Sequence, residues 1–271
     1  TGGAGFIGTR LARRLAAEGS SVVVVDSLHP QVHPDDHAVA ALGADVTFCR
    51  GDVTDAALVD RLVANARPST IVHLAAETGT GQSLRESTRH GSVNVVGTTT
   101  VLDACTRADH VPERIVLTSS RAVYGDGVWI DDETGEEFYG ARRPEDLAAQ
   151  RWDPVAPSGG GATPRANEAG VTEPRPTNVY AATKLAQEHL VAAWTSAFGA
   201  TSRIARLQNV YGPGQAPGNS YTGVLTYFAV RARAGDTIPV FEDGEINRGF
   251  VLIDDVVDGL CAHARASGDV H

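Results

Sequence analysis

The chain has 271 residues, of which 42% are hydrophobic and 21% charged, as in a folded globular protein rather than a disordered one. Its net charge of −10 excludes the basic surface that nucleic-acid binding needs. No apolar run approaches the roughly 20 residues of a membrane-spanning helix. Cys49, Cys105 and Cys261 are few and far apart, which favours a reducing compartment, so we expect a cytoplasmic protein without membrane contact.

Helices and strands alternate along the first half of the chain. After a glycine loop at residues 1–8, the expected helices cover residues 9–18, 56–66 and 92–107. The expected strands cover residues 22–25, 46–49, 70–74 and 114–118. This alternation is typical of parallel βαβ units, so we expect an α/β fold with a Rossmann-type, doubly wound parallel sheet.

The alternation stops at residues 126–176, which contain eleven acidic and five basic residues together with many glycines and prolines. We expect an insertion here that forms a mobile acidic lid or interface arm without metal, and whose charges have few opposite partners. The regular pattern then resumes, with a helix over 178–198, a strand over 202–207, a turn over 211–218, and helices over 223–234 and 254–266. We expect residues 1–205 to form the dinucleotide-binding domain and residues 206–271 a smaller, partial substrate-binding lobe interleaved with it.

The sequence opens directly on its glycine loop, at Thr1, and contains no methionine. A phosphate-binding loop follows a strand in this type of fold, so we expect an interior fragment that lacks the first strand and the C-terminal end of the substrate lobe. The first strand is central in the usual strand order. Without it, the strands at residues 22–25 and 70–74 are expected to face each other across a gap.

Three glycines, Gly2, Gly5 and Gly8, lie at the start of the first helix, where backbone N–H groups can meet a pyrophosphate that side chains would block. Asp26 ends the next strand, where a carboxylate accepts hydrogen bonds from ribose hydroxyls and repels a 2′-phosphate. Gly51-Asp52-Val53 follows the strand after that, near the expected adenine. These features predict a dinucleotide site that prefers NAD to NADP.

Tyr180 and Lys184 are four residues apart, and therefore lie on one face of the expected helix. An ammonium group beside a phenol, with oxidised nicotinamide nearby, lowers the phenol's pKa and makes it a general base for a hydroxyl. An ordinary exposed pair would have the same spacing. Ser120 favours the catalytic interpretation, because it follows the strand after which ligands bind in such sheets.

Four segments of the chain resemble the extended short-chain dehydrogenase/reductases, and within them the NAD-dependent nucleotide-sugar epimerase/dehydratase group. They are TGGAGFIG at residues 1–8, LTSSRAVYG at 117–125, YAATK at 180–184 and RLQNVYGPG at 206–214. The resemblance implies catalytic roles for Ser120, Tyr180 and Lys184, and substrate contacts for Ser120, Asn209 and Arg248, the last at the diphosphate. It implies that NAD is held by Gly2, Gly5, Phe6, Ile7, Gly8, Asp26, Asp52, Val53, Leu74, Ala75, Ala76, Asn94, Tyr180 and Lys184. A dTDP- or UDP-hexose substrate and a homodimer also follow from the resemblance.

Two departures from the group narrow the prediction. The 4,6-dehydratases carry an Asp-Glu pair after the active-site Ser or Thr, where this chain has Arg121 and Ala122, so we expect no dehydration by that route. The motifs and the insertion are most similar to a subgroup that includes dTDP-L-rhamnose 4-epimerases, several of which carry cysteine pairs in the insertion. This insertion has no cysteine, so we expect no thiolate zinc site there.

A second possible metal site is the histidine series His29, His33 and His37. Pro30 interrupts the helix that would align the three rings, so we expect a solvated loop near the adenosine end of the cofactor, and no metal.

The expected function is therefore a 4-epimerase that oxidises the sugar at C4 to a 4-keto intermediate and reduces it again on the opposite face. Two alternatives remain open. One is a 4-ketoreductase or another dehydrogenase of the same family that consumes its cofactor. The other is a non-catalytic NAD-binding regulator.

Overall fold

The computed structural model describes residues 1–33, 37–216 and 223–265, so parts of the expected turn 211–218 and the last residue of the expected helix 254–266 lie outside the described residues. The strands are β1 Val22–Asp26, β2 Val46–Arg50, β3 Thr70–His73, β4 Arg114–Ser120, β5 Val128–Asp131, β6 Glu137–Tyr139, β7 Ala162–Pro164, β8 Thr201–Leu207, β9 Asn209–Tyr211 and β10 Phe250–Leu252. The helices are α1 Phe6–Ala17, α2 His37–Ala40, α3 Ala56–Ala66, α4 Thr80–Ser83, α5 Ser87–His90, α6 Gly97–Arg107, α7 Pro144–Ala148, α8 Val179–Phe198, α9 Val224–Ala234 and α10 Ile253–Arg265.

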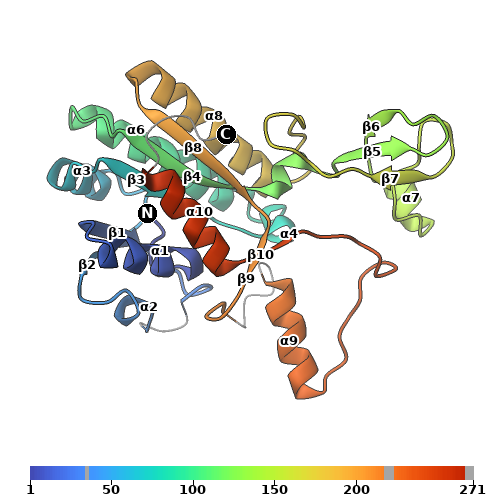
Figure 1. Cartoon of the computed structure of the whole chain (residues 1–271), viewed down its shortest axis with the longest axis horizontal. Helices are drawn as coiled ribbons and strands as arrows, with labels where there is room; N and C mark the ends of the chain where they lie inside the picture. The colour runs from blue at the N-terminus through green and yellow to red at the C-terminus, as the bar shows by residue number, and fades with distance from the viewer. Residues whose placement is uncertain (34–36, 217–222, 266–271) are drawn as a thin grey trace.

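A parallel sheet in two parts forms the centre of the molecule (Figure 1). β1 pairs with β2, and β3, β4 and β8 pair in that order, all in parallel. Side chains alternate between the two faces of a strand, and β4 follows this rule. Ile115 and Leu117 pack with α3, α6 and α8 on one face, and Val116 packs with α1 and α10 on the other. The expected Rossmann-type fold is confirmed.

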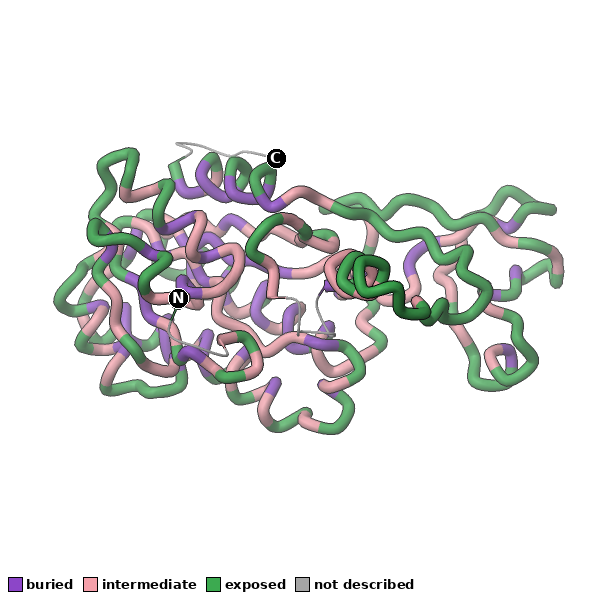
Figure 2. The backbone as a smooth tube through the Cα atoms, turned by 90° about the horizontal axis from the view of Figure 1, so that it is seen from below, coloured by how far each residue is buried: buried purple, intermediate pink, exposed green. Residues whose placement is uncertain are grey.

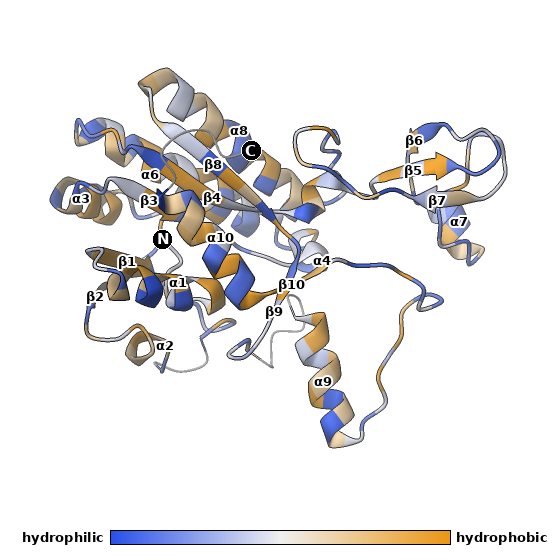
Figure 3. Ribbon diagram, in the orientation of Figure 1, coloured by the Kyte–Doolittle hydropathy of each residue, from blue (hydrophilic) through white to orange (hydrophobic). Residues whose placement is uncertain are grey.

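The helices α1 and α10, which cover one face of the sheet, are amphipathic. Blue and orange stretches alternate along α1 and α10 in Figure 3, as expected of helices with one buried face. Within the described ranges, no helix combines the length and the apolar character needed to span a bilayer.

A gap separates β1 from β3, as the sequence predicts. Thr1 and Gly2 bridge the two strands at one end of the gap: the N-terminal amine of Thr1 donates to the Val72 carbonyl at 2.8 Å, and Gly2 N–H donates to the Val25 carbonyl at 2.8 Å. Beyond this bridge lies a cavity of about 850 Å³, lined by residues of both strands and of α1 and α3.

Several boundaries differ from the sequence expectation. Helix α1 begins at Phe6, inside the glycine loop, rather than at residue 9. The helix expected at 92–107 begins earlier, as α5, and passes through a π-helical turn, Gly91–Val96, before α6. β4 continues to Ser120 and leads directly into a 3₁₀ turn, Arg121–Tyr124. These differences lie near the carboxyl ends of the strands, where the candidate site is.

The insertion forms an arm that projects from the body of the molecule (Figure 1) and is largely exposed (Figure 2). β5 pairs antiparallel with β6 and with β7, and α7 lies beside them. The prediction that its charges have few opposite partners is wrong. Asp146 is buried at the first turn of α7 and pairs with Arg143 at 2.6 Å and with Arg151 at 2.5 Å. The partners are three and five residues away, so a single short turn brings them together.

The C-terminal part contains an unexpected pair of parallel strands, β9 and β10. Each strand has only three residues, which is too short to give a periodic signal in the sequence. The pairing places residues 209–211 beside residues 250–252. Asn209 therefore lies beside the strand that begins two residues after Arg248.

Candidate active site

The glycine loop packs so closely that side chains do not fit. Gly2 has φ +67°, and a Cβ there would lie 2.5 Å from the Ala75 nitrogen at the end of β3. A Cβ at Gly8 would lie 2.5 Å from the Gly2 carbonyl oxygen. Gly5 is the N-cap of α1 and has more room, with the nearest atom 3.4 Å from an added Cβ. The loop therefore brings the N-terminus of α1 against the carboxyl ends of β1 and β3, as pyrophosphate binding requires.

Asp26, the last residue of β1, is tied to this loop. One carboxylate oxygen accepts a hydrogen bond from Ala4 N–H at 3.0 Å, and the other accepts one from Leu28 N–H at 2.9 Å. His33 Nε2 lies 3.6 Å from the second oxygen. A carboxylate has about four lone-pair positions, so Asp26 keeps capacity to accept from a ribose hydroxyl.

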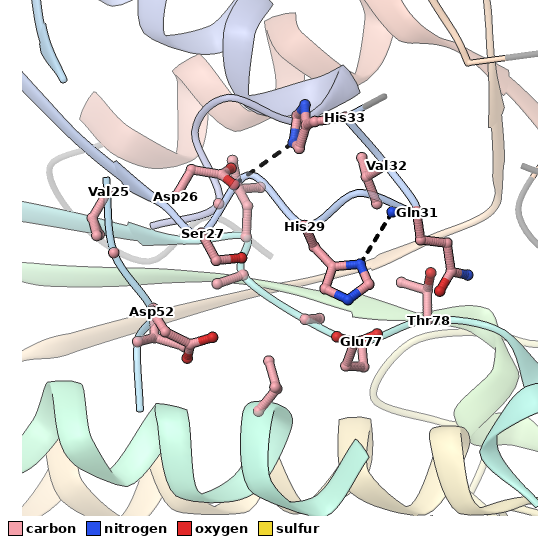
Figure 4. Close-up of a pocket in the computed structure, with 18 of the residues that line it drawn as sticks. Val25, Asp26, Ser27, His29, Gln31, Val32, His33, Asp52, Glu77 and Thr78 are labelled. Atoms are coloured by element: carbon pink, nitrogen blue, oxygen red, sulfur yellow. Dashed lines mark hydrogen bonds and ion pairs between the residues drawn. The ribbon is translucent and has the colours of Figure 1, made fainter. Parts of the chain in front are cut away.

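A pocket of about 160 Å³ lies between the loop, β1 and β3 (Figure 4). Eight of the residues predicted to bind NAD line it: Gly2, Gly5, Asp26, Asp52, Val53, Leu74, Ala75 and Ala76. Other lining residues were not predicted, among them His29, Gln31, His33, Glu77 and Arg89. They come from the loop after β1, from the segment after β3 and from α5, and no motif in the sequence encodes how these segments meet.

His33 corrects the expectation of a solvated histidine loop. Its side chain is only 7% exposed, because the ring packs beside the Asp26 carboxylate (Figure 4). His29 lines the same pocket, and its Nδ1 accepts a hydrogen bond from Gln31 N–H at 3.2 Å. Within residues 1–33, 37–216 and 223–265, no cluster of three potential metal ligands is found.

The other predicted cofactor residues lie outside the pocket lining. Phe6 and Ile7 pack against the core formed by α1, α10 and β4, and Gly8 contacts Gly2 and Gly3. Asn94, in the π-helical turn, is fully buried: its Oδ1 accepts from Glu77 N–H at 2.7 Å, and its Nδ2 donates to the Thr183 hydroxyl at 2.9 Å. Asn94 thus links the segment after β3 to helix α8.

Ser120 and Tyr180 meet at the carboxyl end of β4. Helix α8 starts at Val179, because the Asn178 side chain caps it by accepting from Ala181 N–H at 2.9 Å. Tyr180 therefore lies in the first turn, where Ser120 is close enough to its phenol to influence its pKa. Burial raises the pKa of Tyr180 above its ordinary value, and Ser120 and the Arg121 charge oppose this rise.

Lys184 lies one turn further along α8 and is 2% exposed. Burial lowers the pKa of its ammonium to about 7, against the opposing effect of Glu188, which favours the charged form. At neutral pH the two protonation states of Lys184 are therefore close in free energy, and small changes in its surroundings decide its charge.

Arg121 was considered in the sequence only as a departure from the dehydratases, and its proximity to Tyr180 was missed. Burial and then repulsion from Arg248 lower the pKa of Arg121. Arg248 lies on an exposed stretch, but protein atoms crowd its guanidinium, and this loss of solvent together with repulsion from Arg142 lowers its pKa. Cations are thus gathered near Tyr180, as expected of a place that receives an anion.

The predicted substrate residue Asn209 begins β9, and its Nδ2 donates to the Gly249 carbonyl at 3.0 Å. Arg248 is the neighbour of Gly249, so the two predicted substrate residues lie on adjoining stretches. Arg142, from the insertion, pairs with Glu242 at 2.6 Å and so connects the arm to the same C-terminal loop.

A parallel sheet in which a glycine loop and a carboxylate frame a pocket at the strand ends defines a dinucleotide-binding protein of the Rossmann class. Residues 1–145 and 153–270 match the NAD dependent epimerase/dehydratase family. The chain belongs to this family and is an NAD-dependent enzyme. The crowded glycines and Asp26 fit that cofactor.

Individual relatives agree with this assignment. The chain is 50% identical over 262 residues to a dTDP-L-rhamnose 4-epimerase of Burkholderia thailandensis, a match that covers 97% of this chain and 71% of the relative. It is 32% identical to a UDP-glucose 4-epimerase of Mycolicibacterium smegmatis, over 99% of this chain and 72% of that protein. The solved UDP-glucose 4-epimerase of Thermus thermophilus in complex with NAD superposes with a TM-score of 0.74 at 26% identity, covering 98% of this chain and 73% of that one.

Proposed function

We propose that the protein is a nucleotide-sugar 4-epimerase that oxidises C4 of the sugar transiently and reduces it again on the opposite face. The observation that carries this proposal is the proximity of Ser120 to the Tyr180 phenol at the end of β4, with Lys184 buried one turn away. Arg121 and Ala122 follow Ser120, and neither side chain can supply the acid–base pair that elimination of water requires. The reaction that remains is oxidation and renewed reduction at one carbon, C4.

Each side chain has a distinct task in the proposed reaction. The Tyr180 phenolate takes the proton of the C4 hydroxyl, and the Ser120 hydroxyl donates a hydrogen bond to the C4 oxygen as it becomes a carbonyl. NAD would be held by the glycine loop and Asp26, and when bound it would supply the hydride-transfer chemistry at C4. Tyr180 then returns the proton to the oxygen. The Lys184 ammonium favours the phenolate form of Tyr180 throughout.

The substrate is proposed to be dTDP-L-rhamnose or a related dTDP- or UDP-hexose. The relative at 50% identity supports the dTDP-sugar, and a diphosphate suits the cations near Tyr180. Arg248 is proposed to hold the diphosphate, because guanidinium binds phosphate oxygens in a bidentate way. Asn209 is proposed to contact the sugar.

The division of the chain is part of the same proposal. Residues 1–205 are proposed to hold NAD, and residues 206–271 to belong to the lobe that holds the sugar nucleotide. The arm is proposed to act as a lid or an interface, and the Arg142–Glu242 ion pair supports its contact with that lobe.

We also propose a cytoplasmic homodimer. Three free cysteines that lie apart support a reducing compartment, and the resemblance to the epimerase family supports the homodimer. Sedimentation of the purified protein tests the dimer, and a monomer at micromolar concentration would reject it.

The deciding experiment supplies a sugar nucleotide, deuterated at C4, and no added cofactor. An epimerase converts it to a mixture of the two C4 epimers, and the deuterium stays at C4, because the hydride leaves and returns within one site. Tyr180→Phe should lower turnover by about 10²–10⁴-fold. Consumption of one NAD(P)H per 4-keto sugar would favour the ketoreductase instead. NAD binding without turnover of any sugar nucleotide would favour the regulator.

A further inference from the structure

A buried ion pair lies directly behind the proposed catalytic residues. Glu188 is on α8, one turn after Lys184, and is 5% exposed. Its carboxylate accepts two hydrogen bonds from the Arg206 guanidinium in fork geometry: Nε donates to Oε1 at 3.0 Å and Nη2 donates to Oε2 at 2.7 Å. The Ser119 hydroxyl donates a further, short hydrogen bond to Oε1. Both oxygens of the Glu188 carboxylate therefore accept hydrogen bonds.

The pair connects four elements that carry the proposed active site. Arg206 lies on β8 directly opposite Ser119 of β4, and Ser119 precedes Ser120. The third nitrogen of the guanidinium, Nη1, donates to the Tyr124 hydroxyl at 2.9 Å, at the end of the 3₁₀ turn that follows Ser120. The network thus joins the helix of Tyr180 and Lys184 to the strand and the turn that hold Ser120.

Stability alone does not explain such a pair. Removing two charges from water is expensive, and well-packed apolar residues in place of a buried ion pair are often as stabilising or more so. A bidentate pair does fix geometry, because the fork tolerates little rotation. The position of Glu188, four residues after Lys184, also places a negative charge beside an ammonium that would otherwise be neutralised by burial.

We propose that the Glu188–Arg206 pair is a positioning unit that holds α8 against the end of β4 and keeps Lys184 protonated while Tyr180 acts as the base. This inference rests on the proposed function, since a charged Lys184 is needed only where Tyr180 works as a phenolate. Glu188 acts through Lys184 and Arg206 acts through Glu188. Neither side chain is expected to touch the substrate or NAD.

Other titratable and charged groups surround this part of α8. The groups on the neighbouring elements are His73 of β3, His90 of α5, Arg121 and Tyr124 of the 3₁₀ turn, and Arg206 of β8. Burial first, and then the charge of Lys184, lower the pKa of His73, so it stays neutral near pH 7. Unlike these groups, Glu188 carries a negative charge that favours the protonated form of Lys184.

The test compares the alkaline limb of the kcat profile in Glu188→Gln and Arg206→Gln. Glu188→Gln keeps the shape of the side chain but removes its charge, so the Lys184 pKa falls and the limb should move down by about one pH unit. Arg206→Gln leaves the carboxylate without its counter-ion, so the limb should move up or stay in place. A purely structural role would lower kcat or the melting temperature in both variants without moving the limbs in opposite senses.

Glu188→Asp is the matched control, because it keeps the charge and shortens the side chain. The alkaline limb of kcat in Glu188→Asp should lie at the same pH as in the unsubstituted protein, while kcat itself falls by a few fold. A limb in Glu188→Gln that coincides with that of the unsubstituted protein would overturn the proposal, as would a limb in Glu188→Asp that falls as far as in Glu188→Gln. Should Glu188→Gln not fold, a downward shift in Arg206→Gln would overturn the proposal by itself.

A measurement without substrate separates this inference from the proposed function. Because the pKa of Lys184 is about 7 in the folded protein and about 10.4 in an unfolded chain, the folded state binds fewer protons between these values, and stability rises with pH across that window. Glu188→Gln should extend the rise to lower pH. If the unsubstituted protein converts no sugar nucleotide but this extension is seen, the proposed function fails, and only the electrostatic effect of Glu188 on Lys184 stands. If the extension is missing, the role of Glu188 fails.

Discussion

The Asp26 carboxylate accepts a hydrogen bond from the backbone N–H of Ala4 at 3.0 Å, so the residue expected to bind ribose also holds the glycine loop in place. The two functions are linked, because the loop that would bind pyrophosphate and the side chain that would bind ribose cannot move independently. We therefore expect Asp26 to fix the distance between the sites for the pyrophosphate and the ribose of NAD.

Asp26→Asn separates charge from shape at this position. The amide oxygen can still accept from Ala4 N–H, but the amide nitrogen cannot accept from Leu28 N–H, and the charge that favours ribose hydroxyls is lost. A hydrogen bond to a charged group is worth about 1.5–3 kcal/mol, so NAD binding should weaken by roughly 10- to 100-fold. Calorimetric titration with NAD measures the change, and Asp45→Asn, on an exposed surface, is the control. Unchanged NAD affinity in Asp26→Asn would remove Asp26 from the cofactor site.

Two helical glycines should respond in opposite ways to alanine. In an open helix position, Gly→Ala stabilises by about 0.5–1 kcal/mol, and Gly259 of α10 is such a position, with no atom within 4 Å of an added Cβ. At Gly8 the added Cβ would lie 2.5 Å from the Gly2 carbonyl oxygen and 2.6 Å from Gly3 Cα. Both are backbone atoms, so α1 must move away from the loop. We expect Gly8→Ala to lower the urea midpoint and NAD affinity, and Gly259→Ala to raise the midpoint. A stabilised Gly8→Ala protein would contradict the close approach.

Elements with a repeated local pattern were predicted well from the sequence. The β-branched run at residues 22–25 and the long α8 both gave their type correctly, because each residue contributes to the same periodic signal. The glycine loop and Asp26 were found because their chemistry depends on short spacings along the chain.

Features that depend on tertiary packing were not predicted. The π-helical turn around Asn94 keeps the same side-chain pattern as an α-helix, so its boundaries were missed. Glu188 and Arg206 lie on different elements, and sequence alone does not tell which of many charges will meet. The burial of His33 depends on a loop that folds back onto Asp26.

The strands of the arm are held near a buried carboxylate, that of Asp131, which is 1% exposed. It accepts hydrogen bonds from the backbone and the hydroxyl of Ser158, at 2.9 and 2.8 Å, and from Glu133 N–H at 3.0 Å. A single carboxylate therefore joins the stretch around residues 131–133 to Ser158. Asp131→Asn should speed amide exchange across residues 126–176 and leave exchange in β3, β4 and β8 unchanged.

Asp132→Asn is the control for the arm, because Asp132 is exposed and accepts only from the Thr163 hydroxyl among the bonds of its side chain described here. Exchange in that variant should match the unsubstituted protein. If amide exchange across the arm is as slow in Asp131→Asn as in the unsubstituted protein, the strands β5, β6 and β7 hold together without this carboxylate.

Arg121 gives the last prediction, which concerns the acidic limb of the activity profile. Its guanidinium favours the phenolate of Tyr180, against the effect of burial. Removing that charge in Arg121→Met should raise the pKa of Tyr180. The base must be deprotonated to act, so the acidic limb of kcat should move up by about one pH unit.

Arg248→Met is the matched comparison, since Arg248 acts on Arg121 but is proposed to bind the diphosphate. It should raise KM for the sugar nucleotide and leave the acidic limb near its original position. Profiles of kcat and of kcat/KM between pH 5 and 10 for both variants separate the two effects. If Arg121→Met raises only KM, the arginine binds substrate and does not support the base. If it leaves both parameters unchanged, its charge does not reach Tyr180 in the working enzyme.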